Sequence, residues 1–382
     1  MLSNVNVRDL FLLDPDVVFL NHGAFGACPR PVFAEYQRLQ RELERSPVDF
    51  LALQRGFPAR IGAARERLAA YVGAAPSDLI LVQNATVAIN AVASSLDLRP
   101  GDEIVATTHE YGANELLWRT VCERRGARYV TMDTQPARAV DALLGSVTPR
   151  TRAVFVSHIS SATALRFPVE ELCGRAREAG VLSIVDGAHA PGQIALDVEA
   201  LGADFYAGNC HKWLCAPKGA GFLHVRPEAQ PLLEPPIVSW DWPLDDWADR
   251  FRWTGTRDPS ALLSVPAAID FQVEHDWDGV RTRCHELAVR ATRELAELLG
   301  AEPFADDDSE FVQMVAVRLP PCDAEELSVR LLREQRIDVT AQTWRGEPTL
   351  RISFQGYNDE QDLDALLRAL PRLVRAHRPA MR

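Results

Sequence analysis

Strand-like apolar runs recur through the middle of this chain, and they constrain its fold more than any other feature of its 382 residues. Most runs are nearly continuous in apolar and β-branched residues, which is typical of strands buried on both faces of a sheet. The stretches between them, such as 110–125 and 168–179, carry helical spacing. This alternation predicts a mostly parallel sheet with helices on both faces. The seven runs are LILVQ (79–83), EIVATTH (103–109), ARYVTMD (127–133), RAVFVSH (152–158), VLSIVDGAH (181–189), FYAGNCH (205–211) and AGFLHVR (220–226).

The connections after the sixth run predict the periphery of the fold. Only WLCAPKG joins the last two runs, which is too short for a crossover helix, so we expect the seventh strand to be antiparallel to the sixth. Residues 227–260 are rich in Pro and Trp and indicate an irregular segment. Its tryptophans fit a packed loop and a pocket wall or subunit contact equally well. They are Trp240, Trp242, Trp247 and Trp253.

The last third of the chain returns to regular patterns. Helical spacing and strand-like runs alternate there, which predicts a second, smaller α/β lobe. The helices are expected at 279–299, 323–336 and 359–377, and the strands at 311–319 and 349–356.

Charge and composition exclude several classes of function. Acidic residues outnumber basic ones, 53 to 41, for a formal net charge of −12, and no Lys/Arg block occurs. We therefore expect neither nucleic acid nor a membrane surface as a partner. No apolar run approaches the roughly 18 residues of a membrane span. The first residues lack signal-peptide features, and the seven scattered cysteines suggest no disulfide framework, so we expect a cytoplasmic enzyme or binding protein.

Lysine is almost absent from the chain. Only Lys212 and Lys218 occur among the 41 basic residues, and both lie in HKWLCAPKG. Genomic base composition explains a general replacement of lysine by arginine. A lysine that persists can do what a guanidinium cannot, which is to lose its proton and act as an amine.

Polar residues at the ends of the predicted strands are candidates for a site, because open parallel sheets bind ligands beyond the carboxyl ends of their strands. Asn84-Ala85-Thr86 opens a helix, which suits a phosphate or reflects only an N-cap by Asn84. Asp186 ends a buried strand, either to cap a turn or to pair with a cationic ligand nitrogen, and His189 follows it. His211 and Lys212 end the sixth run, where the lysine is either a nucleophile or a solvated loop residue.

One further candidate lies in the C-terminal lobe. Arg351 lies in a strand, either to bind a carboxylate or to pair with an acidic neighbour. A phosphate seat, a carboxylate, an imine-forming lysine and a carboxylate clamp are together the parts that hold pyridoxal phosphate and an amino acid. No G-x-G-x-x-G occurs to indicate a dinucleotide, and Cys210 and Cys215 alone do not indicate zinc, so we expect no metal site.

The order of these motifs resembles a known family. N-A-T, E-Y, D-G-A-H, H-K-W, T-G-T and R-I-S-F-Q-G-Y-N occur in the order seen in fold-type I pyridoxal phosphate enzymes of the class V aminotransferase family. The stretches FLNHGAFGACPRPV and HISSATALRFPVEEL are similar to its isopenicillin N epimerase-like branch, which includes cysteine-conjugate C–S lyases. The resemblance covers nearly the whole chain. It implies a seven-stranded mostly parallel sheet in a large domain, 21–258, and a small domain formed by 259–382 with the segment 1–20.

The resemblance also implies a role for each matching residue. Lys212 would carry the Schiff base, and Asp186 would keep the pyridine nitrogen protonated. Arg351 would bind the substrate carboxylate, and Thr256 would reach the phosphate of a neighbouring subunit in a homodimer. The remaining cofactor-binding positions would hold the phosphate, stack on the ring or lie near the ring oxygen. They are Asn84, Ala85, Thr86, Asn209 and His211 for the phosphate, Tyr111 for the ring face, and His189 and Ser161 for the ring oxygen.

The reaction is less constrained than the cofactor. No cysteine follows Cys322, so the persulfide chemistry of cysteine desulfurases is not expected, and Ser161 replaces their usual Asn. We therefore favour a C–S β-lyase acting on an S-substituted cysteine. Epimerisation, decarboxylation and transamination stay open, as does a binding protein of this fold without turnover. Epimerisation needs a second acid across the ring, for which Tyr111 and His22 are the candidates.

Overall fold

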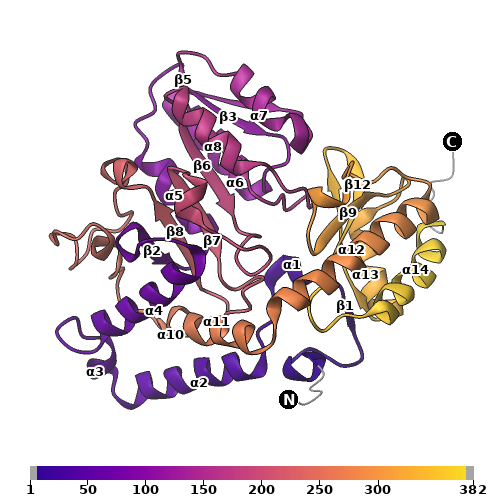
Figure 1. The fold of residues 1–382 in the computed structure, drawn as a ribbon, viewed down its shortest axis with the longest axis horizontal. Helices are drawn as coiled ribbons and strands as arrows, with labels where there is room; N and C mark the ends of the chain where they lie inside the picture. The colour runs from indigo at the N-terminus through magenta and orange to yellow at the C-terminus, as the bar shows by residue number, and fades with distance from the viewer. Residues whose placement is uncertain (1–6, 376–382) are drawn as a thin grey trace.

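The computed structural model describes residues 7–375, and a seven-stranded sheet forms the centre of its larger lobe (Figure 1). The strand order is β2-β8-β7-β6-β5-β3-β4. The pairs among β3 to β7 are all parallel, whereas β8 is antiparallel to both β7 and β2. The predicted sheet and the reversed seventh run are therefore confirmed. The strands are β2 (Leu79–Val82), β3 (Glu103–Thr107), β4 (Arg128–Met132), β5 (Thr151–Ser157), β6 (Leu182–Gly187), β7 (Phe205–Asn209) and β8 (Gly221–Val225).

Helices cover both faces of this sheet, because successive side chains of a strand point to opposite faces. In β5, Ala153 and Phe155 pack into the core beneath α5 (Ala85–Ser95) and α6 (Gly112–Arg125). Val154 and Val156 pack into the opposite core, with α4 (Phe57–Val72), α7 (Pro136–Gly145) and α8 (Val169–Glu178). The expected helices at 110–125 and 168–179 correspond to α6 and α8.

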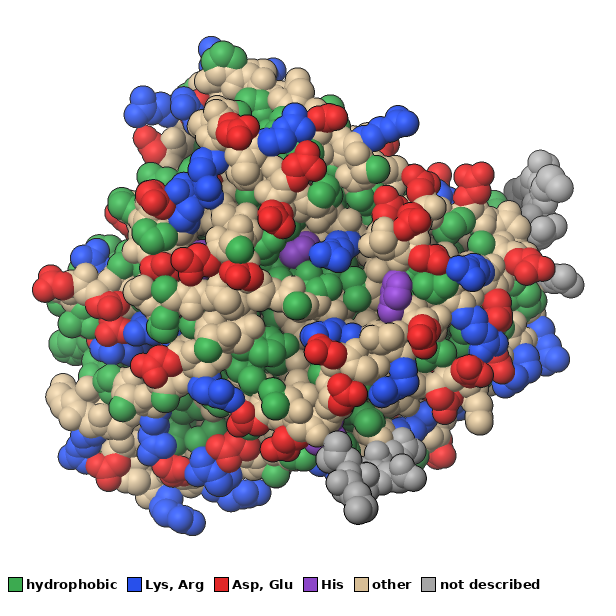
Figure 2. Space-filling model, viewed as in Figure 1, with side chains coloured by type: hydrophobic (Ala, Val, Ile, Leu, Met, Phe, Trp, Pro, Cys, Tyr) green, Lys and Arg blue, Asp and Glu red, His purple; other side chains and the backbone are tan. Residues whose placement is uncertain are grey.

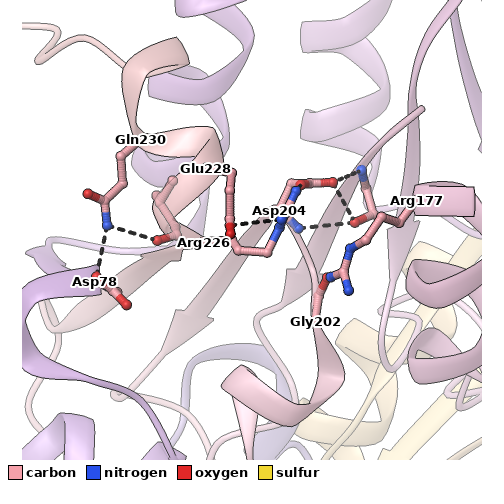
Figure 3. A network of polar contacts seen from close by, with 9 residues as sticks. Asp78, Arg177, Gly202, Asp204, Arg226, Glu228 and Gln230 are labelled. Carbon is pink, nitrogen blue, oxygen red and sulfur yellow. Dashed lines mark hydrogen bonds and ion pairs between the residues drawn. The ribbon is translucent and has the colours of Figure 1, made fainter. Parts of the chain in front are cut away.

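A buried polar network joins the strands at the end of the sheet away from their carboxyl ends (Figure 3). Asp204, just before β7, accepts hydrogen bonds from the backbone N–H and hydroxyl of Ser183 in β6, at 2.8 and 3.0 Å. It also pairs with Arg226, which follows β8. At the neighbouring edge, Gln230 donates to Asp78 next to β2. This network therefore fixes one end of four adjacent strands, β2, β8, β7 and β6. It does not contribute to the other end of the sheet, where the parallel strands have their carboxyl ends.

The smaller lobe has its own antiparallel sheet, in the order β11-β12-β9. Two helices pack against it and a third packs on those two helices, which confirms the expected C-terminal α/β unit (Figure 1). The last two residues of the helix expected at 359–377 lie outside the described residues, as do residues 1–6 and 376–382 of the expected domains. The elements are β9 (Met314–Arg318), β11 (Thr340–Trp344), β12 (Glu347–Ser353), α12 (Trp277–Leu299), α13 (Ala324–Gln335) and α14 (Glu360–Arg375).

We propose the division into a large domain, 21–258, and a small domain built from 1–20 and 259–382. Its N-terminal part is supported by β1 (Val18–Phe19), which pairs with β10 (Ile337–Asp338) in parallel. However, α10 (Ser260–Leu263) and α11 (Val265–Glu274) pack on α4 and on α2 (Arg30–Arg45) in the larger lobe. This packing favours a boundary after α11 rather than at 258.

The Pro- and Trp-rich segment is irregular, as expected, with only the 3₁₀ turns η3 (Pro227–Leu232) and η4 (Ala248–Phe251). Trp253 packs edge-on against Phe57, at a centroid distance of 5.3 Å, whereas Trp240 is 79% exposed. Both line a groove of about 590 Å³. Packed and exposed tryptophans thus occur together in this segment.

The remaining elements are α1 (His22–Phe25), α3 (Pro47–Leu51), α9 (Val198–Leu201), η1 (Val7–Leu10), η2 (Pro76–Asp78) and η5 (Asp308–Glu310).

Candidate active site

A cavity of about 240 Å³ lies where β5, β6 and β7 end and α5 begins. Ten of the sequence-predicted site residues line it, together with Ala24, Phe25, Ser157, Ile159 and Ala188. A larger cavity, of about 810 Å³, lies elsewhere and contains none of the predicted residues. The ten are Asn84, Ala85, Thr86, Tyr111, Ser161, Asp186, His189, Asn209, His211 and Lys212.

Lys212 is half-buried within this group. Its Nζ lies 2.9 Å from Nε2 of His189. Partial burial, which deprives a charged group of hydration, and the nearby Arg351 together lower the pKa of the Lys212 ammonium to about 7. The attraction of Asp186 opposes this shift without cancelling it. A large fraction of Lys212 is therefore a free amine at neutral pH, which is the nucleophilic form.

Asp186 ends β6 as a buried carboxylate. It accepts hydrogen bonds from the backbone N–H of Ala188, at 2.9 Å, and from the side-chain amide of Asn114, at 2.7 Å. Burial raises the pKa of Asp186, while Lys212 and these hydrogen bonds oppose the rise. Within residues 7–375 no cationic side chain forms an ion pair with it. A buried carboxylate oriented in this way fits a protonated ring nitrogen.

The start of α5 forms another part of the cavity. Asn84 caps the helix, since its Oδ1 accepts the N–H of Val87 at 2.9 Å. Asn209 in β7 accepts the N–H of Ala85 at 2.8 Å, which fixes the helix start against the sheet. The N-cap interpretation is thus correct for Asn84, which also lines the cavity. The helix start, Thr86 and His211 together suit a phosphate.

Three predicted residues do not line this cavity. Arg351 is buried behind Ser161 and donates to both the backbone oxygen and the hydroxyl of that residue. Its Nε is buried and has no hydrogen-bond partner within the described residues, and burial lowers the pKa of Arg351 to about 10. Thr256 is exposed, away from the cavity. A ligand carboxylate would supply Nε of Arg351 with the hydrogen-bond acceptor that it lacks.

His22 is the third. Its Nδ1 lies 2.9 Å from the hydroxyl of Tyr357, and its Nε2 lies 3.0 Å from the backbone oxygen of Lys212. Because a carbonyl only accepts, Nε2 carries the proton and both ring nitrogens are already paired. Burial lowers the pKa of His22 to about 3. The structure therefore does not bring His22 to the cavity as a proton donor. It holds the backbone of the lysine instead.

Sequence reasoning missed two residues beside Asp186. Asn114 orients the carboxylate, and only its place one turn into α6 could have indicated this. Glu110 is fully buried, and its carboxyl is hydrogen-bonded by Thr107 and Ser157. Burial raises the pKa of Glu110 to about 8, and the nearby Asp186 adds to the rise. Glu110 is therefore mainly neutral at pH 7.

These residues fit one cofactor. A free amine, a carboxylate without a cationic partner and a helix start are the three groups that hold the aldehyde, ring nitrogen and phosphate of pyridoxal phosphate. Together with the fold, they define a pyridoxal phosphate-dependent enzyme of fold type I.

The charged side chains on the surface are mixed in sign, without a basic block on the face that Figure 2 shows. Within residues 7–375 every helix is too short or too polar to cross a membrane.

The chain belongs to the aminotransferase class-V family, whose sequence model matches residues 20–366. It is 40% identical to isopenicillin N epimerase from Streptomyces clavuligerus, over 96% of this chain and 97% of that protein. It is 31% identical to putative L-cysteine desulfhydrase 1 from Oryza sativa, over 94% of this chain and 83% of that one. The crystal structure of the cysteine desulfurase CsdA from Escherichia coli matches with a TM-score of 0.80 at 27% identity, covering 97% of this chain and 98% of that chain. The expected family, fold type and cofactor are thus confirmed.

Proposed function

We propose that this enzyme inverts the configuration of an amino acid at its α-carbon. The observation that carries the proposal is a pair of candidate proton-transfer groups that line one cavity, the amine of Lys212 and the exposed phenol of Tyr111. The full-length similarity to isopenicillin N epimerases supports it. The C–S β-lyase reaction expected from the sequence is the second candidate.

When bound, pyridoxal phosphate would supply an electron sink that acidifies the α-proton of the amino-acid substrate. Asp186, held by Asn114, would keep the ring nitrogen protonated. Arg351 would bind the substrate carboxylate and so orient the α-carbon. The free amine of Lys212 would take the α-proton, a role worth roughly 10²–10⁴-fold in rate.

Inversion requires a proton on the opposite face, and Tyr111 is the candidate donor. Tyr111 is 45% exposed at the cavity, and Lys212 is half-buried there. The phenol of Tyr111 also lies near Arg351, the group that would bind the substrate carboxylate. Lys212 and Tyr111 would then act on opposite faces of the α-carbon.

Elimination of a sulfur substituent from the β-carbon is the second candidate. It needs only the amine of Lys212 as base. Similarity to L-cysteine desulfhydrases favours it, and so does the lack of any cysteine after Cys322, which excludes a persulfide-forming thiol there. The products would be a thiol, a keto acid and ammonia.

One experiment separates the two reactions. The enzyme is incubated with L-amino acids and cysteine S-conjugates in deuterated water, and products are read by chiral chromatography and mass spectrometry. Inverted amino acid with deuterium at the α-carbon and no ammonia supports epimerisation. Equal amounts of thiol, keto acid and ammonia, without inversion, would replace it by the lyase.

Two variants test the roles of the proton-transfer groups. Tyr111→Phe should slow inversion by about 100-fold or more while α-proton exchange with solvent continues, because only the second proton transfer is lost. Lys212→Ala should lose both. Unchanged inversion in Tyr111→Phe would remove Tyr111 from the mechanism.

We also propose that the active enzyme is a cytoplasmic homodimer in which Thr256 reaches the phosphate site of the neighbouring subunit. Thr256 is exposed and away from its own cavity, and Phe25 at the cavity is 75% exposed. Light scattering should give twice the chain mass. Mixing Lys212→Ala with Thr256→Ala subunits should restore activity that neither has alone. A monomer with full activity would exclude this arrangement.

A further inference from the structure

His189 is held between two groups that determine where its proton lies. Its Nε2 is 2.9 Å from Nζ of Lys212, and its Nδ1 is 3.2 Å from Nε1 of Trp213. An indole N–H can only donate, so Nδ1 must be the acceptor in that bond. A neutral imidazole has one proton, and it therefore lies on Nε2 and points to Lys212.

We propose that Trp213 is a positioning residue that fixes this tautomer of His189 and, through it, keeps Lys212 as a free amine. The inference rests on the proposed role of Lys212 as the amine that bonds the cofactor. An Nε2–H directed at Nζ needs a lone pair to accept it, and only the neutral amine has one. An ammonium at Lys212 would place donors on both sides of His189, which only an imidazolate could accept.

The structure holds both rings in this arrangement. Trp213 is fully buried, and its backbone oxygen accepts the side-chain amide of Gln272 at 2.8 Å. Gly192, at φ +89°, lies against the backbone of Trp213, where a β-carbon would come within 2.3 Å of the carbonyl. The backbone oxygen of His189 is bonded by Gln193 at 2.7 Å. These contacts fix the backbone that carries both rings.

The surrounding charges do not supply this effect. Asp186 attracts a proton to Lys212, and Arg351 repels one. His189 faces Lys212, Arg351, His211 and His22, whose charges all oppose protonation of its ring. Burial and the neighbouring Arg351 favour neutral His189, but they do not choose between its two tautomers. Within the described residues, Trp213 is the hydrogen-bond donor that makes this choice.

Trp213→Phe tests the inference, because it removes the N–H and keeps a buried aromatic ring. Without that donor, His189 can place its proton on Nδ1 and accept from a charged Lys212 through Nε2, so the pKa of Lys212 should rise. Trp118→Phe is the matched control. Trp118 is also fully buried, and its N–H has no partner within residues 7–375.

The measurement is the rate at which the full-length chain, freed of cofactor, captures pyridoxal 5′-phosphate between pH 5.5 and 9.5. Borohydride trapping and peptide mass spectrometry identify the modified residue. The native chain and Trp118→Phe should reach half of their maximal rate near pH 7. In Trp213→Phe the midpoint should move up by about one pH unit, so that the capture rate at pH 7 falls about fivefold. Coincident midpoints in the two variants would overturn the inference.

Long-range ¹⁵N NMR of the native chain tests the tautomer without any substitution, in case Trp213→Phe does not fold. The Nε2 of His189 should show a protonated shift and Nδ1 an unprotonated one. The reverse pattern would overturn the inference. Trapping at a residue other than Lys212 would instead refute the proposed function, whatever tautomer the spectra show.

Discussion

Replacing the buried Glu110 by Gln should remove much of the pH dependence of this protein's stability. The pKa of Glu110 is about 8 in the folded chain, against an ordinary value of 4.5. Above pH 4.5 the unfolded chain releases a proton that the folded chain retains. The contribution of this group to stability is therefore complete below pH 4.5 and is lost as the pH rises toward 8.

The size of the effect follows from the shift. At pH 7 the group is about 2.5 pH units above its ordinary pKa, which corresponds to about 3 kcal/mol lost between pH 4.5 and pH 7, at about 1.4 kcal/mol per unit. Gln has the shape of the protonated carboxyl, can serve the hydroxyls of Thr107 and Ser157, and does not titrate.

Urea denaturation at pH 5 and pH 7.5 measures this difference. Glu110→Gln should lose less stability between the two pH values than the native chain, by about 3 kcal/mol. Glu44→Gln, at an exposed position, is the control and should follow the native chain. If the two variants change in parallel, Glu110 is ionised in the fold and the reasoning fails.

Three other substitutions probe separate parts of the molecule. Asp204→Ala leaves Arg226 and the buried groups of Ser183 without their acceptor, so it should cost about 3 kcal/mol in urea denaturation, with activity per folded molecule unchanged. A loss of only about 0.5 kcal/mol, the size typical of a surface substitution, would contradict this. Asn84→Ala removes the cap of α5 and should cost about 1 kcal/mol and weaken cofactor binding in a fluorescence titration. Arg351→Lys should raise KM more than it lowers kcat, because a lysine cannot bind a carboxylate through two parallel hydrogen bonds; an unchanged KM would exclude Arg351 from substrate binding.

The central sheet was predictable because its signals are local. Each strand is an apolar run bounded by polar residues, and the short link after Lys212 determines the direction of β8. Asn84, Asp186 and Lys212 were found for the same reason, since the ends of such strands meet at one edge of the sheet. The helices α2 and α4 were not predicted, although apolar positions spaced among polar ones are the usual sign of a surface helix.

The missed parts of the site depend on contacts between distant segments. Asn114 reaches Asp186 across 72 positions, and His22 reaches Tyr357 across 335. The tryptophan in H-K-W carried no local sign of its bond to His189. His22 was a reasonable candidate as a donor from its type alone, but its partners in three dimensions leave it no free nitrogen.

The lysine peptide is clamped by residues from both ends of the described chain, and this affects how the enzyme can mature. His22 binds the backbone of Lys212 and also Tyr357, while Arg351 closes the cavity behind Ser161. On the ribosome, position 212 is synthesised long before positions 351 and 357. A nascent chain can therefore expose its reactive amine before the carboxylate-binding side has been made, so full assembly of the catalytic centre has to await release or near-completion of translation.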